Sequence, residues 1–273
     1  MTPARILIVA GSDAGGGAGI QADIKTVSAL EGYAMTAVTA LTAQNTLGVQ
    51  SVMGIPEDFI RAQMDSVLDD LGADCIKTGM LHAPAVIDAI ADCLTARAPN
   101  VPLVVDPVMV AQSGDRLVDD AAMNRLRERL IPQASVITPN IPEAEALLGQ
   151  RIQSADEMQD AADALRALGC DAVLLKGGHL SSDDLVDVFA HAGGYLRLHH
   201  PRITTTSDHG TGCTLASAIA EGIGRGMALP AAVERARDYL QQALETAVPL
   251  GTGHGPVNHG HTVIPFAAPQ ITR

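Results

Sequence analysis

Short runs of Val, Ile and Leu alternate along this chain with longer segments of helical periodicity, and this alternation restricts the fold more than any other feature. The apolar runs are RILIVAG, TAVTALTAQ, CIKTGM, PLVVDPV, SVITPN and DAVLLKGG. Continuous apolar runs of this length are typical of strands buried on both faces of a sheet. Apolar residues three and four positions apart predict helices over 20–31, 57–71, 84–97, 119–130 and 155–168. The order predicts an α/β fold with a mainly parallel central sheet and helices on both faces.

Residues 185–203 break this alternation. Two runs of alternating polar and apolar residues flank Gly193-Gly194, which predicts a β-hairpin and a short antiparallel edge. Two further helices are predicted over 211–225 and 230–247, and the tail GTGHGPVNHGH follows them. We find no internal repeat and no linker, so we expect residues 1–273 to form a single domain.

Charge and cysteine usage exclude several classes of protein. With 18 basic and 31 acidic residues the formal net charge is −13, which leaves no excess of positive charge for a nucleic acid or an anionic membrane. The apolar runs are far shorter than a membrane span, and the N-terminus lacks a signal-peptide core, so we expect a cytoplasmic protein. The four cysteines lie far apart without a C-x-x-C, which predicts reduced thiols rather than a zinc site or disulfides.

Lysine is rare in this chain, because arginine supplies nearly all of the basic residues. Lys77 and Lys176 end apolar runs, whereas Lys25 falls inside a predicted helix. Lys176 is our main candidate for a functional cation and Lys77 a weaker one. Aromatic residues make up only 2% of the chain, so a planar ligand ring would be clamped by aliphatic and methionine side chains.

Polar and glycine residues follow most of the predicted strands. In doubly wound sheets ligands bind beyond the carboxyl ends of the strands, so these residues are expected to converge on one edge. In chain order they are Gly11 to Gly19, Gln44-Asn45, Met80, Asp106 and Val108, Asn140 with Glu143, Lys176-Gly177-Gly178, and 210–213. Any one of them could be ordinary loop chemistry, but their number favours a site.

The stretch SDHGTGCTLASAIAEGI places Cys213 where a Gly-Thr-Gly turn enters a predicted helix. Uncommitted N–H groups and the helix dipole make such a turn an anion site. A thiol in that field is expected to have a lowered pKa and to act as a base or nucleophile. The alternative is a small buried side chain that only packs, and the stretch by itself leaves both interpretations open.

Two nucleotide-binding motifs were tested on the glycine loop GSDAGGGAGIQAD. It lacks the G-x-x-x-x-G-K-[ST] of a P-loop, because no lysine follows the glycines. Gly17-x-Gly19-x-x-Ala22 matches the loose dinucleotide fingerprint, but MTAVTALTAQN supplies no acidic residue for the ribose hydroxyls. A nicotinamide-dependent oxidoreductase is therefore disfavoured.

Seven segments together resemble the hydroxymethylpyrimidine/phosphomethylpyrimidine kinases of thiamine biosynthesis, within the ribokinase-like superfamily. They are GSDAGGGAGIQADIKT, TALTAQNT, KTGML, VDPVM, TPNIPEAEALL, LLKGGH and HGTGCTLASAIA. The resemblance extends from about residue 5 to the GHGPVNH tail at 253–259. It implies a ribokinase-like fold, a homodimer, and phosphorylation of 4-amino-5-hydroxymethyl-2-methylpyrimidine and then of its monophosphate, with ATP and Mg²⁺.

The same resemblance implies roles for individual residues. Gln44 would bind the aminopyrimidine edge, because an amide offers a donor and an acceptor. Asn140 and Glu143 would position Mg²⁺ with help from Asp106, and Cys213 would take the hydroxymethyl proton. The remaining assignments concern the ring pocket, lined by Gly11, Ala18, Asp23, Met80 and Val108, and the ATP phosphates, held by Lys176 and the backbone of Gly210, Thr211, Gly212 and Cys213.

Two departures from the family pattern stand out. Asp208 lies two positions before Gly210, where a carboxylate would repel phosphate and raise the pKa of Cys213 unless it points away or to magnesium. Thr78 replaces a larger apolar residue in KTGM. The rival interpretations are a pyridoxine or pyridoxal kinase on the same fold and, from another class, a non-catalytic pyrimidine sensor.

Overall fold

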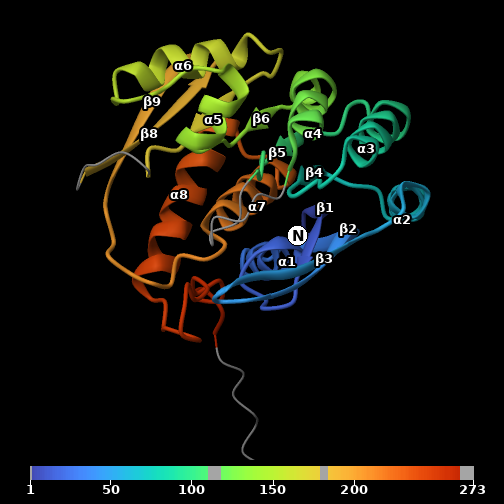
Figure 1. Cartoon of the computed structure of the whole chain (residues 1–273), viewed down its shortest axis with the longest axis horizontal. Coiled ribbons are helices and arrows are strands. Elements are labelled where there is room, and N and C mark those ends of the chain that lie inside the picture. Colours follow the sequence, from blue (N-terminus) through green and yellow to red (C-terminus); the bar gives the residue numbers. More distant parts are fainter. Residues whose placement is uncertain (1, 110–117, 179–183, 265–273) are drawn as a thin grey trace, which may run out of the picture.

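Nine strands form one sheet in this computed structural model, which describes residues 2–109, 118–178 and 184–264 (Figure 1). The spatial order is β3-β2-β1-β4-β5-β6-β7-β8-β9. The strands are β1 (Arg5–Asp13), β2 (Tyr33–Asn45), β3 (Gly48–Gly54), β4 (Cys75–Thr78), β5 (Leu103–Val105), β6 (Val136–Ile137), β7 (Val173–Leu175), β8 (Asp184–His191) and β9 (Gly194–Pro201). All neighbours from β2 through β7 pair in parallel, as the alternation predicted.

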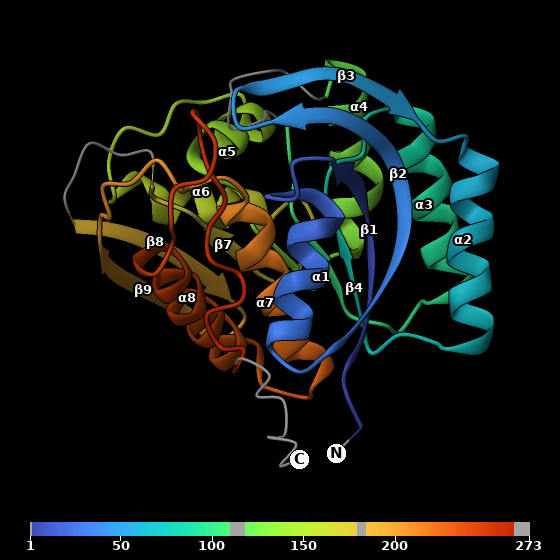
Figure 2. The ribbon, with the colours of Figure 1, turned by 90° about the horizontal axis from the view of Figure 1, so that it is seen from below.

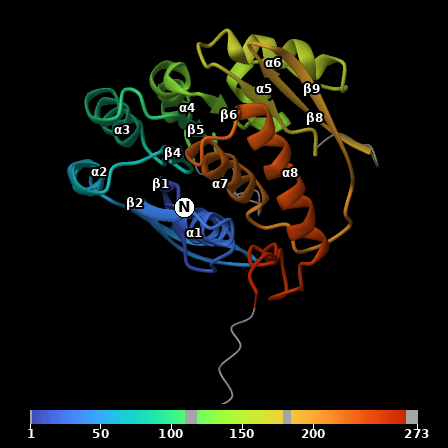
Figure 3. The same cartoon turned by 180° about the vertical axis from the view of Figure 1, so that it is seen from behind.

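Helices cover both faces of the sheet (Figures 1 and 2). The first face carries α2 (Glu57–Asp70), α3 (Pro84–Arg97), α4 (Asp120–Arg125), α5 (Ile141–Leu148) and α6 (Glu157–Arg166). The second face carries α1 (Gly19–Ala29), α7 (Thr211–Gly224) and α8 (Leu229–Glu245), and α7 and α8 lie side by side (Figure 3). None of the helices in the described ranges is long and apolar enough to cross a membrane.

The central strands are apolar throughout because both of their faces are buried. In β1, Leu7 and Val9 pack into the core under α2 and α3, whereas Ile6 and Ile8 pack into the core under α7 and α8. All four side chains are fully buried. Side chains alternate across a strand, so a strand between two helical layers has no polar face.

The fold class predicted from the sequence is confirmed, and so is the β8–β9 hairpin. A second antiparallel edge was not predicted, because β2 continues to Asn45 and turns back as β3 to form a long hairpin (Figure 2). Helix α5 was also not predicted. The predicted helix 119–130 is α4 followed by a π-helical turn over Leu126–Leu130.

The segment that follows α8 returns to the ligand edge of the sheet. The His254 N–H donates to the carbonyl of Thr46 at 2.9 Å, beside the β2–β3 hairpin. The His209 N–H, just before α7, donates to the carbonyl of Gly255 at 3.0 Å. This segment therefore ties the tip of the hairpin to the turn that opens α7 (Figure 3).

Candidate active site

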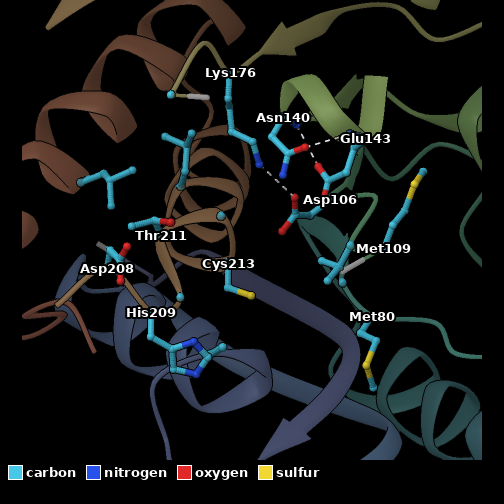
Figure 4. Close-up of a pocket in the computed structure, with 18 of the residues that line it drawn as sticks. Met80, Asp106, Met109, Asn140, Glu143, Lys176, Asp208, His209, Thr211 and Cys213 are labelled. Atoms are coloured by element: carbon cyan, nitrogen blue, oxygen red, sulfur yellow. Dashed lines mark hydrogen bonds and ion pairs between the residues drawn. The ribbon is translucent and has the colours of Figure 1, made fainter. Parts of the chain in front are cut away.

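A cavity of about 820 Å³ lies along the carboxyl ends of the parallel strands. Thirteen of the fourteen site residues that the sequence predicted line it (Figure 4). They are Gly11, Ala18, Gln44, Met80, Asp106, Val108, Asn140, Glu143, Lys176, Gly210, Thr211, Gly212 and Cys213. The exception is Asp23, which is fully buried and is not among the described residues that border the cavity.

The turn that opens α7 has the geometry of an anion site. Gly210 has a φ of +85°, and a Cβ built there would lie 1.8 Å from the carbonyl oxygen of Gly17. Only glycine fits this position, where the turn touches the glycine loop. The helical bonds begin with Thr214 N–H to Gly210 at 2.9 Å, so the N–H groups of Thr211, Gly212 and Cys213 precede the ladder. These donors and the helix dipole favour a phosphate.

Lys176 brings a positive charge to the same turn. Its Nζ lies 3.5 Å from Asp106 Oδ1 and would be 3.4 Å from a Cβ at Gly212. Burial opposes the charge, but Asp106 and Glu143 outweigh burial and raise the pKa of Lys176. The ammonium is therefore kept protonated at the edge of the cavity, where it can meet a phosphate as a point charge.

Asn140 and Glu143 form a capping box at the N-terminus of α5. The Glu143 N–H donates to Asn140 Oδ1 at 2.9 Å, and the Asn140 N–H donates to Glu143 Oε2 at 2.8 Å. Burial raises the pKa of Glu143 to about 7, with Lys176 opposing this shift and Asp106 adding to it. The N-x-x-E pattern therefore has a structural role as well as the metal role that the resemblance implies.

The carboxylates of Asp106 and Glu143 border one side of the cavity, with Lys176 between them and the turn (Figure 4). No three His, Cys, Asp or Glu side chains gather as metal ligands within the described residues. Mg²⁺ usually takes one or two carboxylates together with substrate phosphates and water, rather than an all-protein cage. Two carboxylates in the same cavity as a turn with the geometry of an anion site fit that pattern.

Cys213 differs from its sequence-based expectation. The helix N-terminus was expected to lower the pKa of its thiol, but burial dominates and raises the pKa of Cys213 to about 12. Lys77 opposes this shift, whereas Asp23 and Asp106 add to it. The expectation was wrong because desolvation of the thiolate outweighs the favourable field of the turn and of Lys77, although the half-buried side chain still reaches the cavity. The side chain nevertheless borders the cavity (Figure 4).

Asp23 supports the site from behind instead of lining the ring pocket. Both of its carboxylate oxygens accept from Lys77 Nζ at 2.9 Å, and Asp23 Oδ1 also accepts from Ser217 Oγ at 2.6 Å. Lys77 itself borders the cavity, which agrees with its position at the end of a strand. The prediction that Asp23 lines the pocket is corrected, because its fully buried carboxylate is paired with Lys77, and Lys77 is the member of the pair that borders the cavity.

Asp13 is a central residue of the site that sequence reasoning missed. Its Oδ1 accepts from the Gly15 N–H at 2.7 Å, and its Oδ2 accepts from the N–H groups of Gly17 and Ala18 at 3.0 and 2.8 Å. His209 Nε2 lies 2.9 Å from the same Oδ2. Its position directly before a glycine loop was the available signal, because such aspartates cap turns.

A second buried carboxylate holds the turn that carries Lys176. Asp187 Oδ1 accepts from the Gly177 N–H at 2.8 Å, and Asp187 Oδ2 lies 3.0 Å from Arg237 Nε. A Cβ at Gly177 would lie 2.0 Å from the carbonyl of Val186, so the turn packs against β8. No sequence signal marked Asp187 or Arg237, because each lies inside an ordinary strand or helix pattern.

The part of the cavity around Met80 is apolar. A Cβ at Gly11 would lie 2.5 Å from Met80 Cε, so Met80 covers the backbone of β1 at this point. Val108 and Met109 border the cavity near Met80. These side chains form the aliphatic and methionine surface expected in a chain that contains no tryptophan.

One of the two departures from the family pattern has a structural explanation. Asp208 Oδ1 lies 2.7 Å from Nδ1 of His254, so a partner from the C-terminal segment faces this carboxylate. Thr78 is fully buried in β4, and its hydroxyl finds no hydrogen-bond partner in the part of the chain that the structure describes. Nothing in the structure explains the threonine.

Comparison with known proteins agrees with this geometry. The profile of the phosphomethylpyrimidine kinase family matches residues 13–258. The thiamine biosynthesis bifunctional protein ThiED of Geobacter sulfurreducens is 50% identical over 254 residues, which are 93% of this chain and about half, 52%, of that longer protein. A hydroxymethylpyrimidine/phosphomethylpyrimidine kinase of Streptomyces coelicolor is 45% identical over 95% of this chain and 96% of its own.

Among solved structures, an ADP complex of Bacillus subtilis pyridoxal kinase superposes with a TM-score of 0.88 at 35% identity, over 94% of this chain and 98% of that chain. Pyridoxal kinase thus shares the fold, while of the two more similar sequences the Streptomyces protein is named for the pyrimidine substrate and the Geobacter protein for thiamine biosynthesis. With its profile match and its relatives, this chain belongs to the phosphomethylpyrimidine kinase family.

Proposed function

We propose that this chain transfers the γ-phosphoryl group of ATP to the hydroxymethyl oxygen of 4-amino-5-hydroxymethyl-2-methylpyrimidine, and then transfers a second phosphoryl group to the monophosphate. The observation that carries the proposal is one cavity that joins an amide, Gln44, to a phosphate-binding turn at 210–213. Gln44 suits a ring with adjacent donor and acceptor atoms, and the turn suits the transferred group.

The phosphate end supplies positioning and charge. The N–H groups of Thr211, Gly212 and Cys213 would donate to the oxygens of the γ-phosphoryl group as its charge develops. Lys176 would contact the ATP phosphates as a positive charge. Asp187 would hold the Lys176–Gly177 turn at the required distance through its bond to the Gly177 N–H. Phosphoryl transfer depends mainly on such positioning.

The proton of the alcohol needs an acceptor as the new oxygen–phosphorus bond forms and the bond to the ADP oxygen breaks. Cys213 borders the cavity at the N-terminus of α7. Burial raises the pKa of its thiol, and the charge of Lys77 opposes this shift in favour of the thiolate, which is the form that can accept a proton. We assign the role of proton acceptor to Cys213. Asp106 and Glu143 would hold Mg²⁺ through its phosphate and water ligands, and the metal would neutralise charge on the β- and γ-phosphates.

Pyridoxal kinase is the second candidate, because its structure superposes over 94% of this chain. The relative at 45% identity, however, is named a hydroxymethylpyrimidine/phosphomethylpyrimidine kinase, and the relative at 50% identity is named for thiamine biosynthesis. The two ring classes differ at the edge that Gln44 would meet, where the aminopyrimidine offers an amino donor beside a ring-nitrogen acceptor. The pyrimidine is therefore our choice.

The test is ADP formation by the whole chain with Mg²⁺ and ATP, with the aminopyrimidine alcohol, its monophosphate, pyridoxal or no acceptor. We expect turnover of the first two and much weaker turnover of pyridoxal. Faster turnover of pyridoxal would replace the proposal by the second candidate. No turnover of any acceptor would support a non-catalytic sensor.

A single domain, a homodimer and a cytoplasmic location stay predictions from the sequence.

A further inference from the structure

The orientation of the Gln44 side-chain amide is the feature from which we argue further. Gln44 Nε2 lies 3.5 Å from Nε2 of His209, and its Oε1 lies 3.0 Å from the hydroxyl of Thr42. The two ends of an amide have nearly the same shape, so the hydrogens of its neighbours decide which end points where. For each neighbour, a further hydrogen-bond partner fixes where its hydrogen points.

On one side, this further partner is Asp13. A buried carboxylate that already accepts from the N–H groups of Gly15, Gly17 and Ala18 can only accept again. His209 Nε2, at 2.9 Å, must therefore carry a hydrogen and donate it to Asp13. Burial alone would raise the pKa of Asp13, but the bonds from His209 and the loop outweigh burial and lower the pKa. The acceptor thus stays ionised.

The ring of His209 is held in this position. A Cβ at Gly17 would lie 2.4 Å from Cδ2 of His209, so the ring fills the space beside the glycine loop. The backbone N–H of His209 donates to Gly255 at 3.0 Å, and the side chain is only 12% exposed. The one hydrogen on Nε2 is directed to Asp13, so this nitrogen has no lone pair with which to accept from a Gln44 N–H at 3.5 Å. The carbonyl oxygen of the amide is therefore favoured on this side, because an NH₂ group there would have no acceptor on the ring.

On the other side, this further partner is a backbone carbonyl. The hydroxyl of Thr42 has one hydrogen, and the carbonyl oxygen of Ser12 lies 2.9 Å away to accept it. When Thr42 donates to Ser12, its oxygen is left to accept from Gln44. Both sides then favour the same orientation, in which the amide NH₂ faces Thr42 and the carbonyl oxygen faces His209.

We propose that Asp13, acting through His209, and Ser12, acting through Thr42, lock the Gln44 amide and so set which hydrogen-bond pattern the site accepts. The inference rests on the proposed function for the identity of the ring. The edge of the amide that faces the cavity then offers its acceptor on the side of His209 and its donor on the side of Thr42. The exocyclic amino group lies toward His209 and the ring nitrogen toward Thr42. His209 and Thr42 are positioning residues.

The test uses a ring with the reversed pattern. The 4-oxo analogue of the pyrimidine alcohol offers a ring N–H donor and a carbonyl acceptor where the amino compound offers acceptor and donor. We would titrate both compounds calorimetrically without nucleotide, and ATP separately, into the native chain, His209→Asn, Thr42→Val and the control His254→Asn. His254 contacts Asp208 rather than Gln44, so it matches the histidine change on the same side of the site.

The native chain and His254→Asn should prefer the amino compound by at least about a hundredfold in Kd, because both contacts are reversed in the analogue. His209→Asn and Thr42→Val should each reduce this ratio by about tenfold and leave the Kd for ATP within about twofold. A variant that merely loses structure would lose ATP as well. If His209→Asn loses ATP binding, the test rests on Thr42→Val, which keeps the size of the side chain.

A native ratio near one, or unchanged ratios in both variants, overturns the lock. Preferential binding of the amino compound without ADP formation sinks the proposed kinase function while leaving the lock intact. If neither ring binds, both fail.

Discussion

Both carboxylate oxygens of Asp23 lie 2.9 Å from Nζ of Lys77, and neither side chain is exposed. The pair joins α1 to β4, and Ser217 of α7 donates to it at 2.6 Å. Ser217 follows Cys213 by one helical turn, so the pair lies on the side of α7 that carries the thiol. A buried cation is thereby fixed behind the turn that would hold phosphate.

The first prediction concerns this pair. Asp23→Asn should reduce the free energy of unfolding by about 3 to 5 kcal/mol, because it leaves Lys77 buried without a counter-charge. Asp74→Asn is the control, since it breaks the half-exposed pair with Arg5, whose side chains are 41% and 32% exposed, and should reduce the free energy of unfolding far less. Urea unfolding of both variants measures the difference. Equal losses of unfolding free energy in the two variants would show that burial of the Asp23–Lys77 pair does not add to the cost of breaking it.

The second prediction separates backbone strain from steric conflict at the anion turn. Gly210 and Gly226 have similar φ angles of +85° and +89°, but a Cβ at Gly226 meets nothing within 4 Å. Gly226→Ala should cost about 1 kcal/mol from its left-handed backbone alone and keep full activity. Gly210→Ala should abolish turnover and cost more, because its Cβ would displace the carbonyl of Gly17. Thermal melts and rate measurements on both variants check this, and similar behaviour of the two would contradict it.

The parts of the fold that the sequence predicted are those in which local pattern and burial agree. Strands such as β1 lie between two helical layers, so their apolar runs were unambiguous. Helix α5 was missed because it spans only Ile141–Leu148, too short for clear periodicity, although its capping box is visible in the sequence. Strand β3 was missed because most of its residues are exposed and it lacks an apolar run.

The site was predictable where a residue ends a strand, and less so where its role depends on pairing across the chain. Gln44, Asp106 and Lys176 were found by position alone. Asp13 and His209 are separated by 196 residues, and their contact follows from packing of α7 against the glycine loop. Burial of an individual thiol, which decides the pKa of Cys213, likewise depends on the assembled fold.

The third prediction follows from that thiol. A raised pKa means that the proton stays on Cys213 below the shifted value, so the thiolate is scarce at neutral pH and grows about tenfold per pH unit up to a pH of about 12. Alkylation of Cys213 by iodoacetamide in the folded protein, followed by mass spectrometry, should rise across pH 7 to 9.5 without a plateau. A plateau below pH 8 would show that the turn stabilises the thiolate more strongly than burial opposes it.

The fourth prediction separates the two roles of Glu143. Glutamine can replace glutamate in a capping box, so Glu143→Gln should keep α5 and the melting temperature. Loss of the charge near the phosphates should lower turnover and shift the Mg²⁺ requirement to higher concentration. Asn140→Ala is the comparison, because it removes the cap and should cost about 0.5 to 2 kcal/mol of stability. An unchanged Mg²⁺ titration of Glu143→Gln would remove this residue from the metal site.

The two phosphorylations that we propose place different demands on Cys213. In the first, the acceptor is a neutral alcohol, which must lose a proton as it attacks. In the second, the acceptor is a phosphate monoester with a second pKa near 6, by analogy with phosphorylated side chains, so its oxygens are already largely deprotonated at pH 7.5. A general base has work to do only in the first step, whereas the N–H groups of the turn serve both.

The last prediction uses this contrast. Cys213→Ala should slow the first step by a factor on the order of 10² to 10⁴ and the second step far less. Gly212→Pro is the comparison, because proline removes one backbone donor from the turn and should slow both steps. Each variant is assayed with the alcohol and with the monophosphate at saturating ATP, and the two losses are compared. Equal losses in Cys213→Ala would mean that the side chain orients the turn by packing, and the proton would then need another acceptor.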